Sequence, residues 1–160
     1  MVALVTTSQL QSMTNLPTVT VTIEIPRWSF VKYALTEQGG HVEFISPLPC
    51  PFNYGFVAGL IGGDDLPLDA IVLGSRIQRA SETTVPVRAI VRFTDSGDVD
   101  DKLVCSGTEL SRMHLLSLQV GFRVYVLMKR LVNWSRGKRG RTHYGGVVQD
   151  ADSIQNTIAT

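Results

Sequence analysis

Apolar and polar side chains alternate along several short stretches of this chain, and a period of two is typical of β-strands. The first stretch runs from Val19 to Ile25 and ends at Pro26, whose missing amide hydrogen stops a strand. Two further runs, Phe30–Leu35 and His41–Ile45, flank a turn that contains two glycines, so we expect a hairpin. Other apolar runs of strand length are Ala70–Leu73, Val85–Thr94 and Lys102–Cys105.

One longer apolar stretch, Leu115–Trp134, fits two periods at once. The spacing of Leu118 and Phe122 is helical, whereas a run of alternating valines and larger apolar residues fits a strand. The length of the stretch favours a helix. A short helix is also expected near the C-terminus, where Asp150 or Asp152 could be the N-cap. These elements predict an α+β fold, mainly β, in which a small β-barrel carries one or two packed helices.

The composition indicates one ordinary domain. With 160 residues, 44% of them hydrophobic, the chain is long enough for one core and short of two domains. We assign residues 16–160 to this domain and expect residues 1–15, in which Ser, Thr and Gln dilute the apolar positions, to be a flexible tail. The 15 Lys and Arg and the 14 Asp and Glu give a net charge of +1, so no overall field favours nucleic acid or an anionic membrane.

The pattern of charges and cysteines favours a cytoplasmic protein. The first 23 residues hold no Lys or Arg, so the basic start of a signal or transit peptide is missing. The most apolar later stretch is interrupted by Gln119 and Arg123 and is too short to cross a bilayer. Cys50 and Cys105 do not match the spacing of a zinc site or a disulfide framework, so we expect free thiols. An organelle lumen reached without a recognisable targeting signal is the alternative compartment.

Aspartates are concentrated in two short segments, the run DDLPLD at residues 64–69 and the run DSGDVDD at residues 95–101. Hard cations such as Mg²⁺ take oxygen ligands, so carboxylates that converge from two loops can hold more than one ion. Two such ions can clamp phosphoryl oxygens and turn a bound water into hydroxide. The alternative is that these aspartates cap helices and bond to their own backbone in turns. The residues alone leave both interpretations open.

Five motifs, in order along the chain, carry a family resemblance. They are IEIP at 23–26, KY at 32–33, PFNYGF at 51–56, DDLPLD at 64–69 and DSGDVDDK at 95–102. In this order and spacing they resemble the soluble family I inorganic pyrophosphatases. The resemblance implies a five-stranded, OB-like barrel that binds Mg²⁺, with Mn²⁺ as an alternative, and hydrolyses pyrophosphate to two phosphates. It also implies a homo-oligomer or a subunit of a larger assembly.

The resemblance also implies roles for residues of these motifs. Four aspartates match metal ligands: Asp64, Asp69 and Asp100 for the central ions, and Asp95 for an ion that accompanies the substrate. Three residues match groups that hold phosphate oxygens: Lys32, Tyr54 and Lys102. Glu24 matches an acid of the water network around the metals and is a candidate catalytic residue.

Several positions depart from the family pattern. Leu66 stands where the family has the aspartate that takes the proton of the nucleophilic water, and an aliphatic side chain cannot do this. One hypothesis is a slow enzyme in which Asp65 replaces the missing base. Ala34 and Cys50 replace a glutamate and a tyrosine, and the arginine expected between residues 40 and 50 has no counterpart. The other hypothesis is a degraded, pyrophosphatase-like subunit with a binding or structural role.

A basic segment, Lys129–Arg141, holds six Lys or Arg in thirteen positions; it contains Trp134, and Tyr144 follows it closely. Aromatic rings interleaved with positive charge on an OB-like barrel can bind RNA. The alternative is a solvated loop after a helix C-terminus, where the helix dipole favours cations. The small net charge of the chain favours the second interpretation. Lys129 could also replace a lysine of the family's C-terminal helix, although a charge on the helix surface is the simpler expectation.

Overall fold

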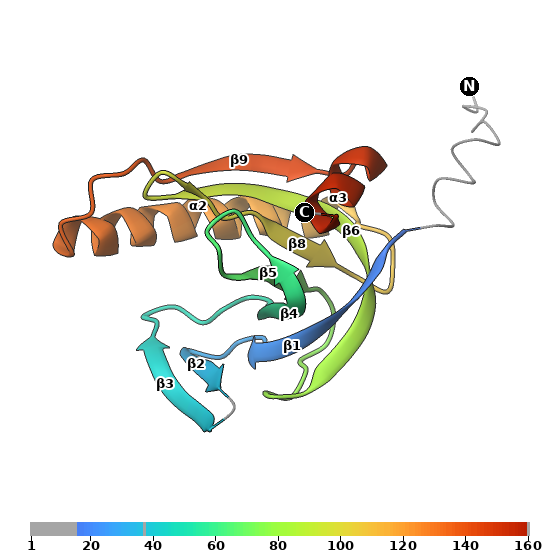
Figure 1. The fold of residues 1–160 in the computed structure, drawn as a ribbon, viewed down its shortest axis with the longest axis horizontal. Coiled ribbons are helices and arrows are strands. Elements are labelled where there is room, and N and C mark those ends of the chain that lie inside the picture. Colours follow the sequence, from blue (N-terminus) through green and yellow to red (C-terminus); the bar gives the residue numbers. More distant parts are fainter. Residues whose placement is uncertain (1–15, 37, 160) are drawn as a thin grey trace.

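The computed structural model describes residues 16–36 and 38–159 (Figure 1). The expected tail, residues 1–15, lies outside the described residues. The elements follow the order β1 (Thr18–Ile25), β2 (Val31–Thr36), β3 (Gly39–Ile45), β4 (Asn53–Ile61), β5 (Pro67–Val72), β6 (Glu82–Asp95), β7 (Asp98–Val99), β8 (Lys102–Cys105), α2 (Arg112–Ser135), β9 (His143–Val148) and α3 (Ala151–Ile158). No helix in these described ranges is long and apolar enough to span a membrane.

Five strands close into a barrel in the order β1, β4, β5, β8 and β6, and β6 pairs back with β1. The closing pair joins Val19 to Val85 and Val21 to Thr83 in antiparallel register. Only β5 and β8 run parallel among the barrel strands, with Ala70 opposite Leu103. The predicted α+β, mainly β fold with a five-stranded barrel is therefore confirmed.

Alternation along the barrel strands creates two apolar layers. On β5, Leu68, Ala70 and Val72 point into the barrel, where they pack against residues of β1, β6 and β8. Ile71, between them, points outward and packs under α2 with Val104 of β8. Since side chains alternate across a strand, the odd-numbered residues of β5 face the helix side of the barrel.

A register shift lets the long strand β6 contribute side chains to both apolar layers. Val85 and Val87 point into the barrel, but the pairing with β8 shifts between Val87 and Ala89. Beyond this irregularity the pattern reverses, so that Val91 and Phe93 lie in the outer layer under α2. An extra residue in one strand turns its following side chains to the other face.

Helix α2 begins at a capping box and lies across the outer layer. The side chain of Ser111 accepts a hydrogen bond from the amide of His114, and the His114 ring accepts one from the amide of Ser111. Leu118, Phe122 and Val126 are buried on the barrel side of the helix. The helix expected over this stretch is confirmed.

The remaining elements cover the ends of the barrel. Asp150 caps α3, as expected, and Ile154 of this helix fills one end of the barrel core. Strand β9 was not predicted; it pairs with the second half of β6 and lies beside α2 (Figure 1). The hairpin β2–β3 forms its own two-stranded sheet, as the alternation indicated, and a segment with three prolines, 46–52, leads from it to β4.

Candidate active site

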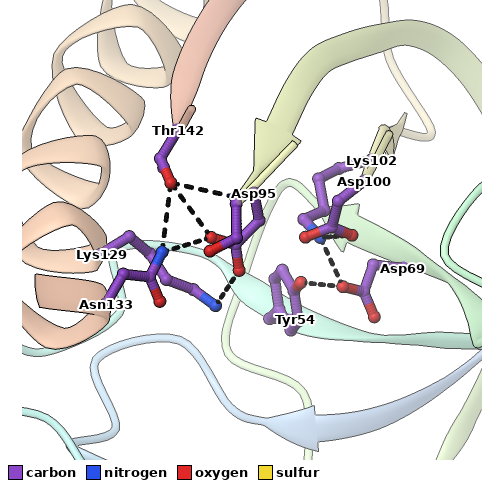
Figure 2. A network of polar contacts seen from close by, with 9 residues as sticks. Tyr54, Asp69, Asp95, Asp100, Lys102, Lys129, Asn133 and Thr142 are labelled. Atoms are coloured by element: carbon purple, nitrogen blue, oxygen red, sulfur yellow. Dashed lines mark hydrogen bonds and ion pairs between the residues drawn. The ribbon is translucent and has the colours of Figure 1, made fainter. Parts of the chain in front are cut away.

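Four polar side chains meet on the outer face of the barrel, and we call them the Lys102 cluster: Tyr54, Asp69, Asp100 and Lys102. The Nζ atom of Lys102 lies 2.7 Å from Oδ2 of Asp69 and also bonds Oδ1 of Asp100. The hydroxyl of Tyr54 donates to the same Asp69 oxygen (Figure 2). The Lys102 side chain is 1% exposed, so this lysine is a buried charge and not a solvated one.

Strand register explains why these side chains meet. Since Ala70 pairs with Leu103 in parallel register, Asp69 and Lys102 occupy neighbouring positions that point to the same face. On the other side of β5, Tyr54 of β4 pairs with Ile71, which places it diagonally from Asp69 and within reach of a long side chain. The alternation that buries the barrel core thus sets the acid, the lysine and the tyrosine side by side.

Burial and mutual charge shift the pKa values in this cluster. Burial raises the pKa of Asp100, and the carboxylates of Asp69 and Asp64 add to the rise, although Lys102 opposes it. Burial acts to lower the pKa of Lys102, but the two carboxylates outweigh it and the net shift is upward. The pKa of Tyr54 is raised well above its usual value by burial and by Asp69, so its hydroxyl stays protonated and donates.

A second group, which we call the Asp95 cluster, contains Asp95, Lys129, Asn133 and Thr142 (Figure 2). Lys129 Nζ lies 2.7 Å from one Asp95 oxygen, and Asn133 Nδ2 donates to the other oxygen at 2.7 Å. Thr142 Oγ1 adds a longer bond of 3.3 Å. Burial would raise the pKa of Asp95, but the hydrogen bonds from Lys129 and Asn133 outweigh it, so the pKa is lowered.

Tyr125 of α2 connects the two clusters electrostatically. Burial raises the pKa of its hydroxyl, and the carboxylates of Asp100, Asp69 and Asp95 all raise it further. The Nζ atom of Lys129 lies 5.8 Å from the centre of the Tyr125 ring. The two clusters therefore face one region between the barrel and α2, with three carboxylates and two lysines around it.

The first acidic segment forms a tight turn between β4 and β5. The Gly62 amide donates to the Leu66 carbonyl at 2.7 Å, and the Leu66 amide donates to Asp64 Oδ1 at 3.2 Å. Asp65 has a φ of 62°, in the left-handed region that aspartate tolerates. Its side chain and that of Leu66 are exposed, and Leu66 is 60% exposed. Asp64 lies close enough to Asp100 to affect its pKa.

Glu24 is coupled electrostatically to Lys32 and to Asp69 of the Lys102 cluster. Burial raises the pKa of Glu24; Lys32 lowers it and Asp69 raises it again, which places Glu24 in electrostatic range of both. Lys32 of β2 pairs with Glu43 of the neighbouring strand at 3.1 Å. Glu24 thus lies in electrostatic range of the Lys102 cluster, and Lys32 lies in range of Glu24.

Within the described ranges, no three His, Cys, Asp or Glu side chains are grouped closely enough to hold a metal ion. Asp69 and Asp100 meet through Lys102, and Asp64 stands apart with its own backbone bond. In this structure the Lys102 ammonium therefore lies between Asp69 and Asp100, and the roles of Asp64, Asp69 and Asp100 as metal ligands stay predictions.

Three residues of the site were not predicted from the sequence. Lys129 was expected to be a charge on the helix surface, but it is bound to Asp95. Asn133 lies four residues later, on the same face of α2, and Thr142 begins the approach to β9. The spacing of four between a lysine and a buried asparagine was the available signal. Asp101, by contrast, pairs with Arg92 at 2.5 Å, outside both clusters.

The RNA-binding interpretation needs free aromatic rings and cations. Trp134 is 78% exposed, but Lys129 is engaged with Asp95, and the Tyr144 ring stacks on Phe122 with centroids 5.9 Å apart. Two of the groups on which that interpretation rested therefore have structural partners.

The fold and the two clusters describe a five-stranded barrel protein that carries a site of carboxylates and lysines between its outer face and α2. The sequence profile of the inorganic pyrophosphatase family matches residues 21–133. The chain is 38% identical over 96 residues to an inorganic pyrophosphatase of Streptomyces coelicolor, and 33% identical over 89 residues to one of Helicobacter pylori. The chain belongs to the inorganic pyrophosphatase family.

The coverage of these relatives is partial. The matched segments make up 53% and 52% of this chain and 55% and 51% of the two relatives, so the chain spans about half their length. Solved structures match more of the chain. An inorganic pyrophosphatase of Coxiella burnetii superposes with a TM-score of 0.74 at 20% identity, over 91% of this chain and 93% of that one. One of Neisseria gonorrhoeae gives 0.72 at 22% identity, over 89% and 87%.

Proposed function

We propose that this chain hydrolyses inorganic pyrophosphate slowly to two phosphates, with a divalent cation as cofactor. The observation that carries the proposal is the Lys102 cluster: Asp69, Asp100, Lys102 and Tyr54 meet, and each stands in a matched family motif. Family membership supports the same activity.

The donor set fits Mg²⁺, or alternatively Mn²⁺. In the described part of the chain, Asp69 Oδ1 and Asp100 Oδ2 make no hydrogen bond, so each carboxylate keeps one oxygen for a ligand. Hard divalent cations prefer such oxygens and retain several waters. Asp64 and Asp95 are the further carboxylates that we assign to metal binding. A bound cation would supply hydroxide from water near neutral pH and neutralise phosphate charge.

The cationic and hydroxyl groups of the chain would hold the phosphates. Lys102 and Lys32 offer compact positive charges, and the Tyr54 hydroxyl stays a donor because its pKa is raised. Glu24 and Asp65 are the assigned acids for the water network. Asp65 is exposed and can take a proton, whereas its neighbour Leu66 cannot. Losing a well-placed base costs on the order of 10²–10⁴ in rate, which is why we propose slow turnover.

Release of phosphate from pyrophosphate, followed with and without millimolar Mg²⁺, tests the proposal. We expect Mg²⁺-dependent release by the native chain and its loss in Asp69→Asn, which removes a carboxylate oxygen of the Lys102 cluster. Asp152→Asn on α3 is the matched control, because Asp152 is exposed and lies on a different element. Release without Mg²⁺ dependence, or equal release by both variants, would contradict the proposal.

A second candidate function, a pyrophosphatase-like subunit without catalysis, is favoured by one observation. In this structure the Lys102 ammonium bonds both Asp69 and Asp100, and the exposed side chain at the position of the usual base is aliphatic. Such a chain would keep phosphate or metal affinity and act through assembly. The native chain would then release no phosphate, although it would still bind pyrophosphate.

We also propose that the chain self-associates through the outer face of α2. Seven apolar side chains recur at spacings of three and four along this helix and are 39–78% exposed: Met113, Leu116, Val120, Val124, Leu127, Leu131 and Trp134. This stripe lies opposite the buried face of α2. Contiguous apolar stripes of this length are characteristic of protein interfaces, and a straight helix face can pair with a second copy of itself.

A reducing compartment, the cytoplasm or an organelle lumen, is the location that we propose. Cys50 and Cys105 are both free in the structure. Burial raises the pKa of Cys105 to about 12 and raises that of Cys50 as well, so both stay protonated thiols near neutral pH. Neither thiol is activated for disulfide exchange.

A further inference from the structure

A cavity of about 520 Å³ lies between the hairpin β2–β3, the proline segment 46–52 and α2. Its walls are mainly apolar and include Phe30, Phe44, Leu48, Phe52, Val124 and Met128. Cys50, whose thiol stays neutral, is also part of the wall. Cavities of this size and lining hold organic ligands with a few polar anchor groups.

Positive side chains outnumber negative ones around this cavity. Four cations line it, Lys32, Lys129, Arg136 and Lys138, against one carboxylate, Glu43. Lys32 is paired with Glu43, and Lys129 with Asp95. Among the described residues, Arg136 and Lys138 form no ion pair. The cavity therefore combines an apolar interior with an excess of positive charge at its border.

The cavity is continuous with the candidate active site. Tyr54 lines it and also belongs to the Lys102 cluster, while Lys129 and Asn133 line it and belong to the Asp95 cluster. A ligand with its apolar part in the cavity would therefore have an anionic end within reach of both clusters. Inorganic pyrophosphate is small and fully ionic, and it gains nothing from an apolar wall.

We propose that the site binds a diphosphate ester whose organic group is a hydrocarbon chain, with the diphosphate at the two clusters and the chain in the cavity. This inference rests on the proposed function, since it assumes that the clusters hold a diphosphate. The apolar walls favour binding of the hydrocarbon chain, and the cationic border complements the negative charge of the diphosphate.

Isothermal calorimetry with butyl, hexyl and octyl diphosphate tests this inference, with inorganic pyrophosphate as the reference. Each methylene moved from water into the cavity tightens binding about fourfold until the cavity is full. We expect the dissociation constant to fall in this way from butyl to octyl diphosphate. Octanoate, which has a chain but a single carboxylate, should bind far more weakly than octyl diphosphate.

Two valine-to-tryptophan variants test whether the hydrocarbon chain of the ligand lies in the cavity. Val124→Trp fills the cavity from α2, and Val120→Trp, one turn earlier and 54% exposed, does not line it. We expect Val124→Trp to remove the dependence on chain length and to leave pyrophosphate binding unchanged, while Val120→Trp changes neither. Both positions lie on the exposed stripe of α2. An effect on self-association is therefore common to the two variants and does not explain a difference between them.

The outcomes separate this inference from the proposed function. Binding that does not depend on chain length, an equal effect of both variants, or octanoate binding as tight as octyl diphosphate would overturn the inference, even if pyrophosphate is hydrolysed. A dependence of binding on chain length that Val124→Trp removes supports it, even if the native protein releases no phosphate from pyrophosphate. In that case only the proposed hydrolysis fails.

Discussion

A lysine that is 1% exposed stays charged here because two carboxylates meet its ammonium group. Burial alone would favour the neutral amine, but the pKa of Lys102 is raised. Removing Lys102 would leave Asp69 and Asp100 as neighbouring half-buried acids without a counter-charge. A cation from solution would be the natural replacement for the missing charge.

Leu66 and Asp65 provide a test of catalysis at the scale of single residues. Leu66→Asp returns a proton acceptor at the position of the family's base, so we expect phosphate release to rise by on the order of 10²-fold. Asp65→Asn should abolish the native rate if Asp65 has taken over that role. Both rates are measured as phosphate release in saturating Mg²⁺.

The paired result distinguishes the two hypotheses. An active native chain that Asp65→Asn inactivates, and that Leu66→Asp does not improve, would support the enzyme with a shifted base. A native chain without activity, unchanged by Leu66→Asp, would contradict catalysis and favour the subunit with a binding or structural role. Both residues are exposed in a turn, so neither change should disturb the barrel.

Asp95 offers a test by pH. Its pKa is lowered in the folded chain, so its ion pair stabilises the fold above the unfolded pKa of about 3.8, and this stability is lost as the pH falls through the folded pKa. We expect Asp95→Asn to lower the free energy of unfolding by about 1.5–3 kcal/mol at pH 7, and the difference from the native chain to shrink below pH 4. Urea unfolding in the presence of a chelator measures both. Asp98→Asn, at an exposed position, is the control, and a difference that does not shrink as the pH falls below 4 would contradict the assignment.

At the scale of elements, alternation predicted the strands that build the barrel, and length decided the helix. Strand β9 was missed because its sequence, HYGGVV, contains two glycines and follows a basic segment, and because its pairing with β6 is a distant contact that local patterns do not encode. The acids were predicted from motifs, but Asn133 and Thr142 are ordinary residues until the fold brings them to Asp95. The Lys102 ammonium between two acids likewise depends on the parallel register of β5 and β8.

The exposed stripe on α2 predicts a dependence of assembly on one side chain. Leu127→Lys places a charge in the middle of the stripe, where the leucine is 66% exposed, so the protomer should fold and the association should weaken by about 100-fold or more. Sedimentation velocity measures this. Gln119→Lys, on α2 but outside the stripe, should leave the association unchanged. A native chain that stays monomeric at high concentration would contradict self-association.

At the scale of the molecule, charge is sharply segregated. Residues 111–149 hold eight of the 15 Lys and Arg and none of the 14 Asp and Glu, so this segment carries +8 and the rest of the chain −7. The small net charge therefore conceals a strong local field along α2 and the following loop. Such a field attracts anions to that side of the molecule, and its effect falls with ionic strength.

The stability of the whole fold should respond to divalent cations that bind the carboxylates of the Lys102 cluster. A cation that binds only the folded chain stabilises it by about 2.7 kcal/mol at a hundredfold excess over its dissociation constant, which corresponds to a rise in melting temperature of roughly 5–10 °C. We expect this rise in millimolar Mg²⁺ and expect Asp69→Asn to lose most of it. Differential scanning calorimetry at constant ionic strength measures both, and an unchanged melting temperature of the native chain would contradict metal binding by the cluster.

Strand β6 has a consequence for the order in which the chain acquires its structure during synthesis. It pairs with β1, which precedes it by some sixty residues, and with β7, β8 and β9, which follow it. Until β6 has left the ribosome, β1 has no partner on one side, and until β8 follows, the gap between β5 and β6 cannot close. Until then the nascent chain carries open sheet edges that are exposed to aggregation, and the barrel closes only after β8 has been made.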